Sequence, residues 1–258
     1  MTSVPAAPSG VRPFGMSDEP PRSTPEFEYR PQGGVAKMLV FFLALAALVQ
    51  FVSAGSTVLT MNFADALLRG AVITPAQLAA EGARQSILSI GGLGTWLICA
   101  ILFCTWVVRA NKNARGLGAE GLKTSPGWCA GWFFIPIAFW IKPYQAVREI
   151  WQASDPNMPA HSTMGWQGSD VGGAVVGWWM TWLLGVWGPG LAWLIVVLII
   201  KPQNVTILFW VVAFGHMVTA VSGVMAINVV NGVEARQAER ANARIARART
   251  QQQSAAAA

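Results

Sequence analysis

Apolar residues form four long segments of the chain, residues 35–61, 87–108, 171–200 and 205–230. These segments contain no Asp or Glu, and Lys37 is the one Lys or Arg within them. A helix needs about 20 apolar residues to cross the roughly 30 Å hydrocarbon core of a bilayer. The pattern therefore predicts an all-α polytopic membrane protein with four spanning helices, in a transmembrane domain over residues 35–232.

A fifth apolar segment, residues 127–141, is short and contains Pro136. A helix of this length extends only about 22 Å, less than the hydrocarbon core. Pro136 also removes a helical hydrogen bond and disfavours helix at Ile135, so the chain should bend there. We expect a Pro-kinked third segment that is re-entrant or shallow in the membrane.

The next residues, 143–154, have the spacing of an amphipathic helix. Their apolar side chains share one helical face: Tyr144, Val147, Ile150 and Trp151. Such a helix is typical of the membrane interface, although the same periodicity also suits packing against a helix bundle. We expect the interfacial placement.

The segment over residues 171–200 is interrupted by Gly188-Pro189-Gly190. It could be one kinked helix, or a span that ends near Trp187 and is followed by an embedded turn. The second piece alone is too short to cross a bilayer, so one bent helix is favoured.

The two ends of the chain differ from the apolar domain. Residues 1–34 contain seven prolines and little apolar clustering, which predicts a disordered arm. Residues 233–258 are rich in Ala, Arg and Glu at helical spacing, which predicts a basic helix and tail.

Positive charge is concentrated in three places. Lys and Arg gather before the first apolar segment, in residues 109–124 and in the tail (Arg236, Arg240, Arg244, Arg247 and Arg249). Because Lys and Arg mark the cytoplasmic side, we expect both termini and the 109–124 loop to be cytoplasmic. A fifth crossing would place the tail outside, so four spans are preferred. With 12% charged and 53% hydrophobic residues, the composition also excludes an ordinary soluble domain, which carries about 25% charged residues.

Three stretches resemble a known family. They are "RANKNARGLG" (109–118), "SPGWCAGWFFIPIAFWIKPYQAVREIWQAS" (125–154) and "GWWMTWLLG" (177–185). Together they resemble the bacterial family called domain of unknown function 4328, over roughly residues 35–235. The chain departs from it in a long apolar extension after Gly185, and in Phe139-Trp140 where members often have Asn. The resemblance implies a protein of the bacterial cytoplasmic (inner) membrane and brings no activity, cofactor or catalytic residue.

Basic and aromatic residues near the third segment are candidates for contact with lipid headgroups. These residues are Lys112, Arg115, Lys123, Trp128 and Trp132. Ordinary interfacial anchoring by the tryptophans is the alternative.

His216 lies within the last apolar segment, where ionisable side chains are expensive and often functional. It could form a helix-to-helix hydrogen bond, or line a polar path with Ser222 and Asn228. The spacing of Met158, His161 and Met164 could supply soft ligands to Cu(I), with a plain loop as the alternative.

The chain lacks a nucleophile elbow, a phosphate-cradling loop and a carboxylate pair. We therefore expect a protein that is not an enzyme, with no catalytic residue, cofactor, resident metal or nucleic-acid partner. The leading hypothesis is a scaffold or subunit that presents a cytoplasmic surface to lipids, to a second copy or to a membrane-complex partner. The alternatives are a small channel or facilitator with a polar path at His216, and a sensor that binds anionic lipid.

Overall fold

The computed structural model describes residues 27–157, 165–195, 198 and 205–257, and every regular element in these residues is a helix. The α-helices are α1 (Gly33–Leu68), α2 (Pro75–Gly116), α3 (Pro126–Gly131), α4 (Lys142–Ala153), α5 (Gly173–Ile195) and α6 (Val205–Ala257). Short 3₁₀ helices are η1 (Trp132–Phe134), η2 (Ala138–Trp140) and η3 (Gly165–Gly168).

Three of the described helices, α1, α2 and α6, are long and apolar enough to cross a membrane. The sequence predicted four such helices. The fourth, α5, is not in this set, because its 23 residues include Pro189 and many Trp and Gly, which lower its mean hydropathy. The remainder of the predicted 171–200 span lies largely outside the described residues.

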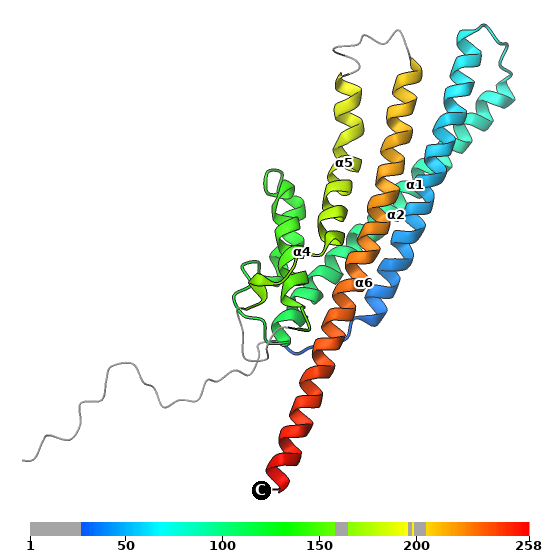
Figure 1. Ribbon diagram of the computed structural model, residues 1–258. Helices are drawn as coiled ribbons and strands as arrows, with labels where there is room; N and C mark the ends of the chain where they lie inside the picture. Colours follow the sequence, from blue (N-terminus) through cyan, green and yellow to red (C-terminus); the bar gives the residue numbers. More distant parts are fainter. Residues whose placement is uncertain (1–26, 158–164, 196–197, 199–204, 258) are drawn as a thin grey trace, which may run out of the picture.

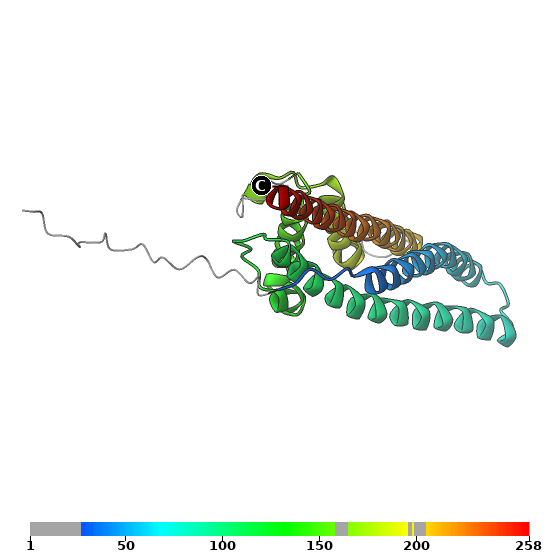
Figure 2. The same cartoon turned by 90° about the horizontal axis from the view of Figure 1, so that it is seen from below.

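The long helices are arranged in the order α2, α1, α6, α5 (Figures 1 and 2). Figure 1 shows the turn between α1 and α2 at the same end as the last residues of α5 and the first residues of α6. The opposite end holds the first described residues, α4 and the C-terminus. We call these the turn end and the terminal end. Every predicted cluster of Lys and Arg in the described residues lies toward the terminal end.

The start of α2 is fixed by its local sequence. Thr74 is the N-cap and Pro75 the first helical residue. The Thr74 hydroxyl accepts a hydrogen bond from the Gln77 backbone N–H, and the Gln77 side chain accepts one from the Thr74 N–H. This capping box satisfies donors that an open helix end would leave free.

Residues 126–141 form a short hairpin of α3 and η1 against η2. Ile135 leaves the helical region, with φ −102° and ψ 114°, as expected for the residue before Pro136. The chain then reverses, and the Phe139 backbone N–H donates to the Ile135 carbonyl at 2.8 Å. The predicted bend is therefore present, and it leaves Phe134 and Ile137 exposed at its tip, at 77% and 88%.

The apolar face of α4 is used inside the protein. Val147 and Ile150 are fully buried, and they belong to a core shared with α1, α2, α5 and α6. Of the two uses that the sequence allowed, the structure therefore has α4 packed against the bundle, and its apolar side chains are not free to enter a lipid interface. Gln145 and Arg148 are exposed on the other face.

The helix α5 is continuous through Gly188-Pro189-Gly190, which agrees with one helix rather than a span and a turn. The Pro189 ring packs directly on Gly215 of α6, where an added Cβ would clash with it. One turn earlier along α5, Gly185 lies against Thr219 in the same way. Small residues thus let α5 and α6 approach closely, as is common between membrane helices.

The predicted disordered arm, residues 1–34, extended too far along the chain. Gly33 and Gly34 already belong to α1, and residues 27–32 lie along α2. Residues 1–26 lie outside the described part of the chain.

Candidate functional site

The candidate site is built on the last turns of α2 and the loop that follows. Arg115 donates from its guanidinium to the carbonyls of Leu122 and Thr124, at 3.1 and 3.0 Å. Its Nε donates to Asn111 Oδ1 at 2.9 Å, and Asn111 donates to the Thr124 carbonyl. Arg115 therefore holds the loop in shape, and these bonds occupy the side chain that the sequence suggested for a headgroup.

Asn113 holds residues 27–32 against α2. Its Oδ1 accepts from the Arg30 backbone N–H at 3.0 Å, and its Nδ2 donates to the Arg30 carbonyl at 2.9 Å. One turn further on, Gly116 lies so close to the backbone of Phe27 and Tyr29 that a Cβ would be 2.8 Å from both. Residues 27–32 are therefore docked on α2 by two residues. The Asn113 amide pairs with their backbone, and Gly116 leaves space for that backbone.

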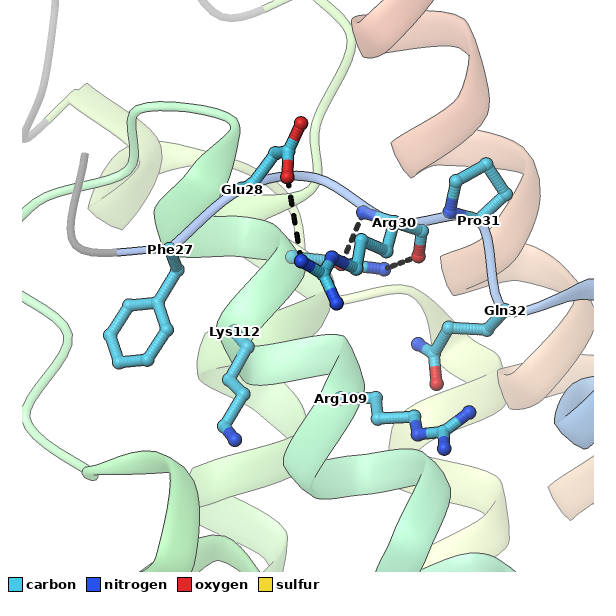
Figure 3. Close-up of a pocket in the computed structure, with 8 residues that line it drawn as sticks. Phe27, Glu28, Arg30, Pro31, Gln32, Arg109 and Lys112 are labelled. Atoms are coloured by element: carbon cyan, nitrogen blue, oxygen red, sulfur yellow. Dashed lines mark hydrogen bonds and ion pairs between the residues drawn. The ribbon is translucent and has the colours of Figure 1, made fainter. Parts of the chain in front are cut away.

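The docked segment and α2 enclose a basic pocket of about 550 Å³. Figure 3 shows Arg109 and Lys112 on α2 beside the segment that carries Phe27 and Arg30. Its lining has three basic residues and one acidic residue, together with aromatic and polar residues: Phe27, Glu28, Arg30, Pro31, Gln32, Arg109, Lys112 and Asn113.

The charges of the basic pocket remain accessible. Arg109 and Lys112 are exposed, and the Lys112 ammonium lies 6.0 Å from the centroid of the Phe27 ring. Glu28 pairs with Arg30 at 3.6 Å, but both side chains are more than 80% exposed, at 81% and 83%. An exposed pair of this kind is weak, and with three basic residues against one acidic residue the lining has a net positive charge.

Glu234 of α6 connects the docked segment to the bundle. Its Oε1 accepts from Gln32 Nε2 at 3.2 Å and from Trp106 Nε1 at 3.0 Å. Burial raises the pKa of Glu234, and the Trp106 hydrogen bond opposes this effect. The residue lies about 44 Å along α6 from its start, beyond the thickness of a hydrocarbon core.

The first basic residues of the tail bind carbonyls at helix ends. Arg236 and Arg240 donate to the carbonyls of Trp151 and Ala153, at the end of α4, at 3.3 and 2.6 Å. Arg244 donates to the Gly116 carbonyl at the end of α2, at 2.9 Å. Cations are favourable there, because a helix C-terminus has free carbonyls and a partial negative charge.

Of the predicted headgroup contacts, only Lys112 lines the basic pocket. Trp128 and Trp132 stack on each other, with ring centroids 4.6 Å apart, and Lys142 lies over the Trp132 ring at 5.7 Å. Lys123 is exposed in the loop. Sequence reasoning missed Arg30 and Arg109 as pocket residues, although Arg109 opens the family motif that the sequence displays.

The three residues predicted to line a polar path lie on different faces of α6. His216, Ser222 and Asn228 are six residues apart, so they point in directions about 120° apart on α6. His216 Nδ1 lies 2.6 Å from Gln50 Oε1 of α1, in the helix-to-helix bond that was one of its two predicted uses. Ser222 is buried, whereas Asn228 is exposed.

The predicted metal-binding group, Met158, His161 and Met164, lies outside the described residues. Within the described part of the chain, no group of three or more His, Cys, Asp or Glu side chains is placed to hold a metal ion.

A family model, the domain of unknown function DUF4328, matches residues 69–235. This range includes α2 to α5 and the part of α6 that contains Glu234. Comparison with curated proteins and with solved structures gives no match. Because the model matches more than half of the chain and contains the motif residues Asn113 and Arg115, the chain belongs to the DUF4328 family.

Proposed function

We propose that this protein spans the bacterial inner membrane four times, with both ends in the cytoplasm, and binds the headgroup of an anionic phospholipid in its basic pocket. The observation that carries the proposal is the gathering of Arg30, Arg109 and Lys112 around one cavity. In this account the protein is a binding protein without a catalytic step.

The four-span topology requires α5 to cross the membrane. Its 23 residues extend about 34 Å, enough for a hydrocarbon core of roughly 30 Å. It lies beside α6, and its exposed side chains are apolar, including Met180, Leu184 and Leu191. Four antiparallel spans also keep all basic clusters on one side, as the positive-inside rule requires.

The four-span topology also supports insertion of the α3–η2 hairpin into the membrane. The Trp140 ring stacks on Trp187 with centroids 4.9 Å apart. Trp187 lies about 21 Å along α5 from its start. If α5 spans the bilayer, the exposed Phe134 and Ile137 lie within it, as a re-entrant segment requires.

The position of the basic pocket suits a lipid better than a soluble anion. Arg109 directly follows the apolar residues 87–108 of α2, so it lies where that helix leaves the hydrocarbon core. The Phe27 ring supplies an apolar wall beside Lys112. A phospholipid offers a phosphate to the cations and acyl chains to the adjacent membrane.

Thermal unfolding in neutral detergent tests the proposal. We expect soluble dihexanoyl phosphatidylglycerol to raise the Tm, because a ligand that binds the folded state stabilises it. Replacement of Arg109 and Lys112 together by Gln should weaken this binding roughly 30-fold. The matched control replaces Arg148 and Arg249, which are exposed and outside the pocket.

Two further arms identify the source of the phosphate. Dihexanoyl phosphatidylcholine should raise the Tm much less, since its headgroup has no net charge. An equal effect of inorganic phosphate at the same concentration would assign the pocket to a free anion. If both lipids stabilise the protein equally, or if the pocket variant behaves like its control, the proposal fails.

A scaffold role is a second candidate, favoured by the last turns of α6. Residues 246–256 are exposed on all sides and project beyond the rest of the molecule (Figure 1). A helix without contacts in its own chain is a surface for another chain. Removal of residues 246–258 should then change the oligomeric mass measured by light scattering, and an unchanged mass would remove a second copy as the partner.

A further inference from the structure

Polar faces of α1 and α2 meet at the turn end and extend into the proposed membrane region. On α1 the polar residues recur at helical spacing: Gln50, Ser53, Thr57 and Thr60. On α2 the facing polar residues do the same: Glu81, Gln85 and Ser89. The polar positions extend about 15 Å along α1 and about 12 Å along α2. Polar side chains are expensive in a bilayer, so two matched faces of this length indicate a site.

The face begins near the turn end with a cluster of charged and polar groups. The Thr60 hydroxyl donates to Glu81 Oε1 at 2.7 Å. Arg84 pairs with the Glu81 carboxylate at 2.5 Å, and this pair is partly buried, with side-chain exposures of 31% and 14%. Gln85 also bonds Thr60 and Glu81. The Glu81 and Arg84 charges cancel, so the cluster has no net charge. It places hydrophilic groups at the turn end of the two polar faces.

Deeper along the same faces lies a cavity of about 230 Å³. It is lined by hydroxyl, amide and imidazole groups, and no lining residue is acidic or carries a permanent positive charge: Gln50, Ser53, Thr57, Gln85, Ser89 and His216, with Leu88, Gly92 and Leu93. Its lining includes the hydrogen-bonded pair His216 and Gln50, with 2.6 Å between Nδ1 and Oε1. At about 30 Å³ per water, the cavity has room for several waters or one small solute.

Apolar packing closes the way toward the terminal end. Gly223 of α6 lies against α1, where an added Cβ would be 3.2 Å from the Ala47 Cβ and 3.4 Å from the Leu43 carbonyl. Below this contact the helices share a buried apolar core that includes Leu39 and Val230. The polar faces therefore lead into a dead end and not through a pore.

We infer that the space between these faces is a water-filled crevice, open at the turn end, that binds a small neutral molecule with hydrogen-bond donors and acceptors. The lining has no Asp, Glu, Lys or Arg, which favours a neutral solute over an ion. The Ser53 and Thr57 hydroxyls donate to backbone carbonyls of their own helix, which leaves their lone pairs free to accept hydrogen bonds from a solute. This site is separate from the basic pocket at the other end of the molecule.

Cysteine accessibility tests the inference on the full chain in intact cells. The probe is the membrane-impermeant reagent sulfonatoethyl methanethiosulfonate, and peptide mass spectrometry reads the modification at each introduced cysteine. We expect Ser89→Cys to react at least tenfold faster than its neighbour Ile90→Cys, because Ile90 is 72% exposed on the lipid-facing surface. Thr57→Cys should exceed Leu59→Cys for the same reason.

A loop control separates the crevice from the topology. Val72 lies in the turn between α1 and α2 and is 93% exposed, so Val72→Cys should react from outside the cell. If it reacts while Ser89→Cys and Thr57→Cys are as slow as their neighbours, the crevice is dry and the inference is wrong. If Val72→Cys reacts only from the cytoplasm, the proposed topology is wrong, and the same two comparisons made from that side decide the crevice.

Discussion

Asn113 and Arg115 lie two positions apart in one motif, and the fold uses both for shape rather than for a ligand. Asn113 pairs with the backbone of Arg30, and Arg115 pairs with carbonyls of the following loop. The charge of Arg115 is therefore committed inside the chain, whereas Arg109 and Lys112 stay exposed. Arg115 is thus a structural residue with carbonyl partners, whereas Arg109 and Lys112 are basic residues that line a cavity.

Replacement of Asn113 by Ala tests the docking of residues 27–32. The variant leaves the Arg30 N–H and carbonyl without their partner, which should lower the free energy of unfolding by roughly 1–3 kcal/mol. Hydrogen exchange in residues 27–32 should accelerate more than in α4. The exposed Asn231→Ala is the control, and equal exchange in the two variants would contradict the docking role.

The buried carboxyl group of Glu234 should make the free energy of unfolding depend on pH. Burial raises its pKa above the ordinary value of 4.5, so the folded state holds this proton more tightly than the unfolded state. The free energy of unfolding therefore falls as the pH rises from about 4.5 through the raised pKa, and it stays at the lower level above that point. Glu234→Gln removes this fall and should stabilise the protein more at pH 8 than at pH 4.

Thermal unfolding at both pH values measures this effect. The exposed Glu239→Gln on the same helix is the control. If Glu234→Gln destabilises the protein more at pH 8 than at pH 4, the carboxylate is a stabilising anion in the folded state, and the assignment is wrong.

At the scale of the elements, Trp151 holds the end of α4 in place. The Trp151 ring lies between Gly172 and Gly232, and the Arg236 guanidinium lies over it at 4.4 Å. A Cβ at Gly232 would be 2.5 Å from the ring. This arrangement fixes α4 against α6 and the start of α5.

Gly232→Ala should therefore destabilise the protein by about 1–3 kcal/mol through overpacking. An Ala within an unobstructed helix is normally favourable by roughly 0.5–1 kcal/mol. Gly173→Ala, where nothing lies within 4 Å of the added Cβ, should show that gain or no change. A Tm for Gly232→Ala at or above that of Gly173→Ala would contradict the packing role of Trp151.

The elements that could be predicted from the sequence are those fixed by local chemistry. The Thr74 cap and the bend at Pro136 depend on neighbouring residues, and both are present. The buried face of α4 and the docking of residues 27–32 depend on partners far away in the sequence. A periodic pattern shows that a helix has an apolar face but does not identify what covers it.

The same limit applies to the candidate site. Lys112 was identified because it lies in a basic loop before an aromatic segment. Arg30 reaches the pocket only because Asn113 and Gly116, more than 80 residues later, hold its backbone. The polar residues of α1 and α2 recur at helical spacing in the sequence, but spacing within one helix does not show which helix its polar face meets.

For the whole molecule, the account predicts that the two ends of the bundle face opposite sides of the membrane. Thr250→Cys in the tail should react with an impermeant thiol reagent only after the cells are opened, whereas Val72→Cys should react in intact cells. Both positions are exposed. Reaction of both positions in intact cells would show that the number of spans is odd and would contradict the four-span topology.

The central claim is that the basic pocket holds an anionic phospholipid, and native mass spectrometry of the protein released from its own membrane tests it most directly. We predict that the wild-type protein and the Arg148→Gln, Arg249→Gln control retain a bound anionic phospholipid. The Arg109→Gln, Lys112→Gln variant should lose most of it. Equal retention by all three proteins, or retention of only zwitterionic lipid by the wild type, would contradict the account.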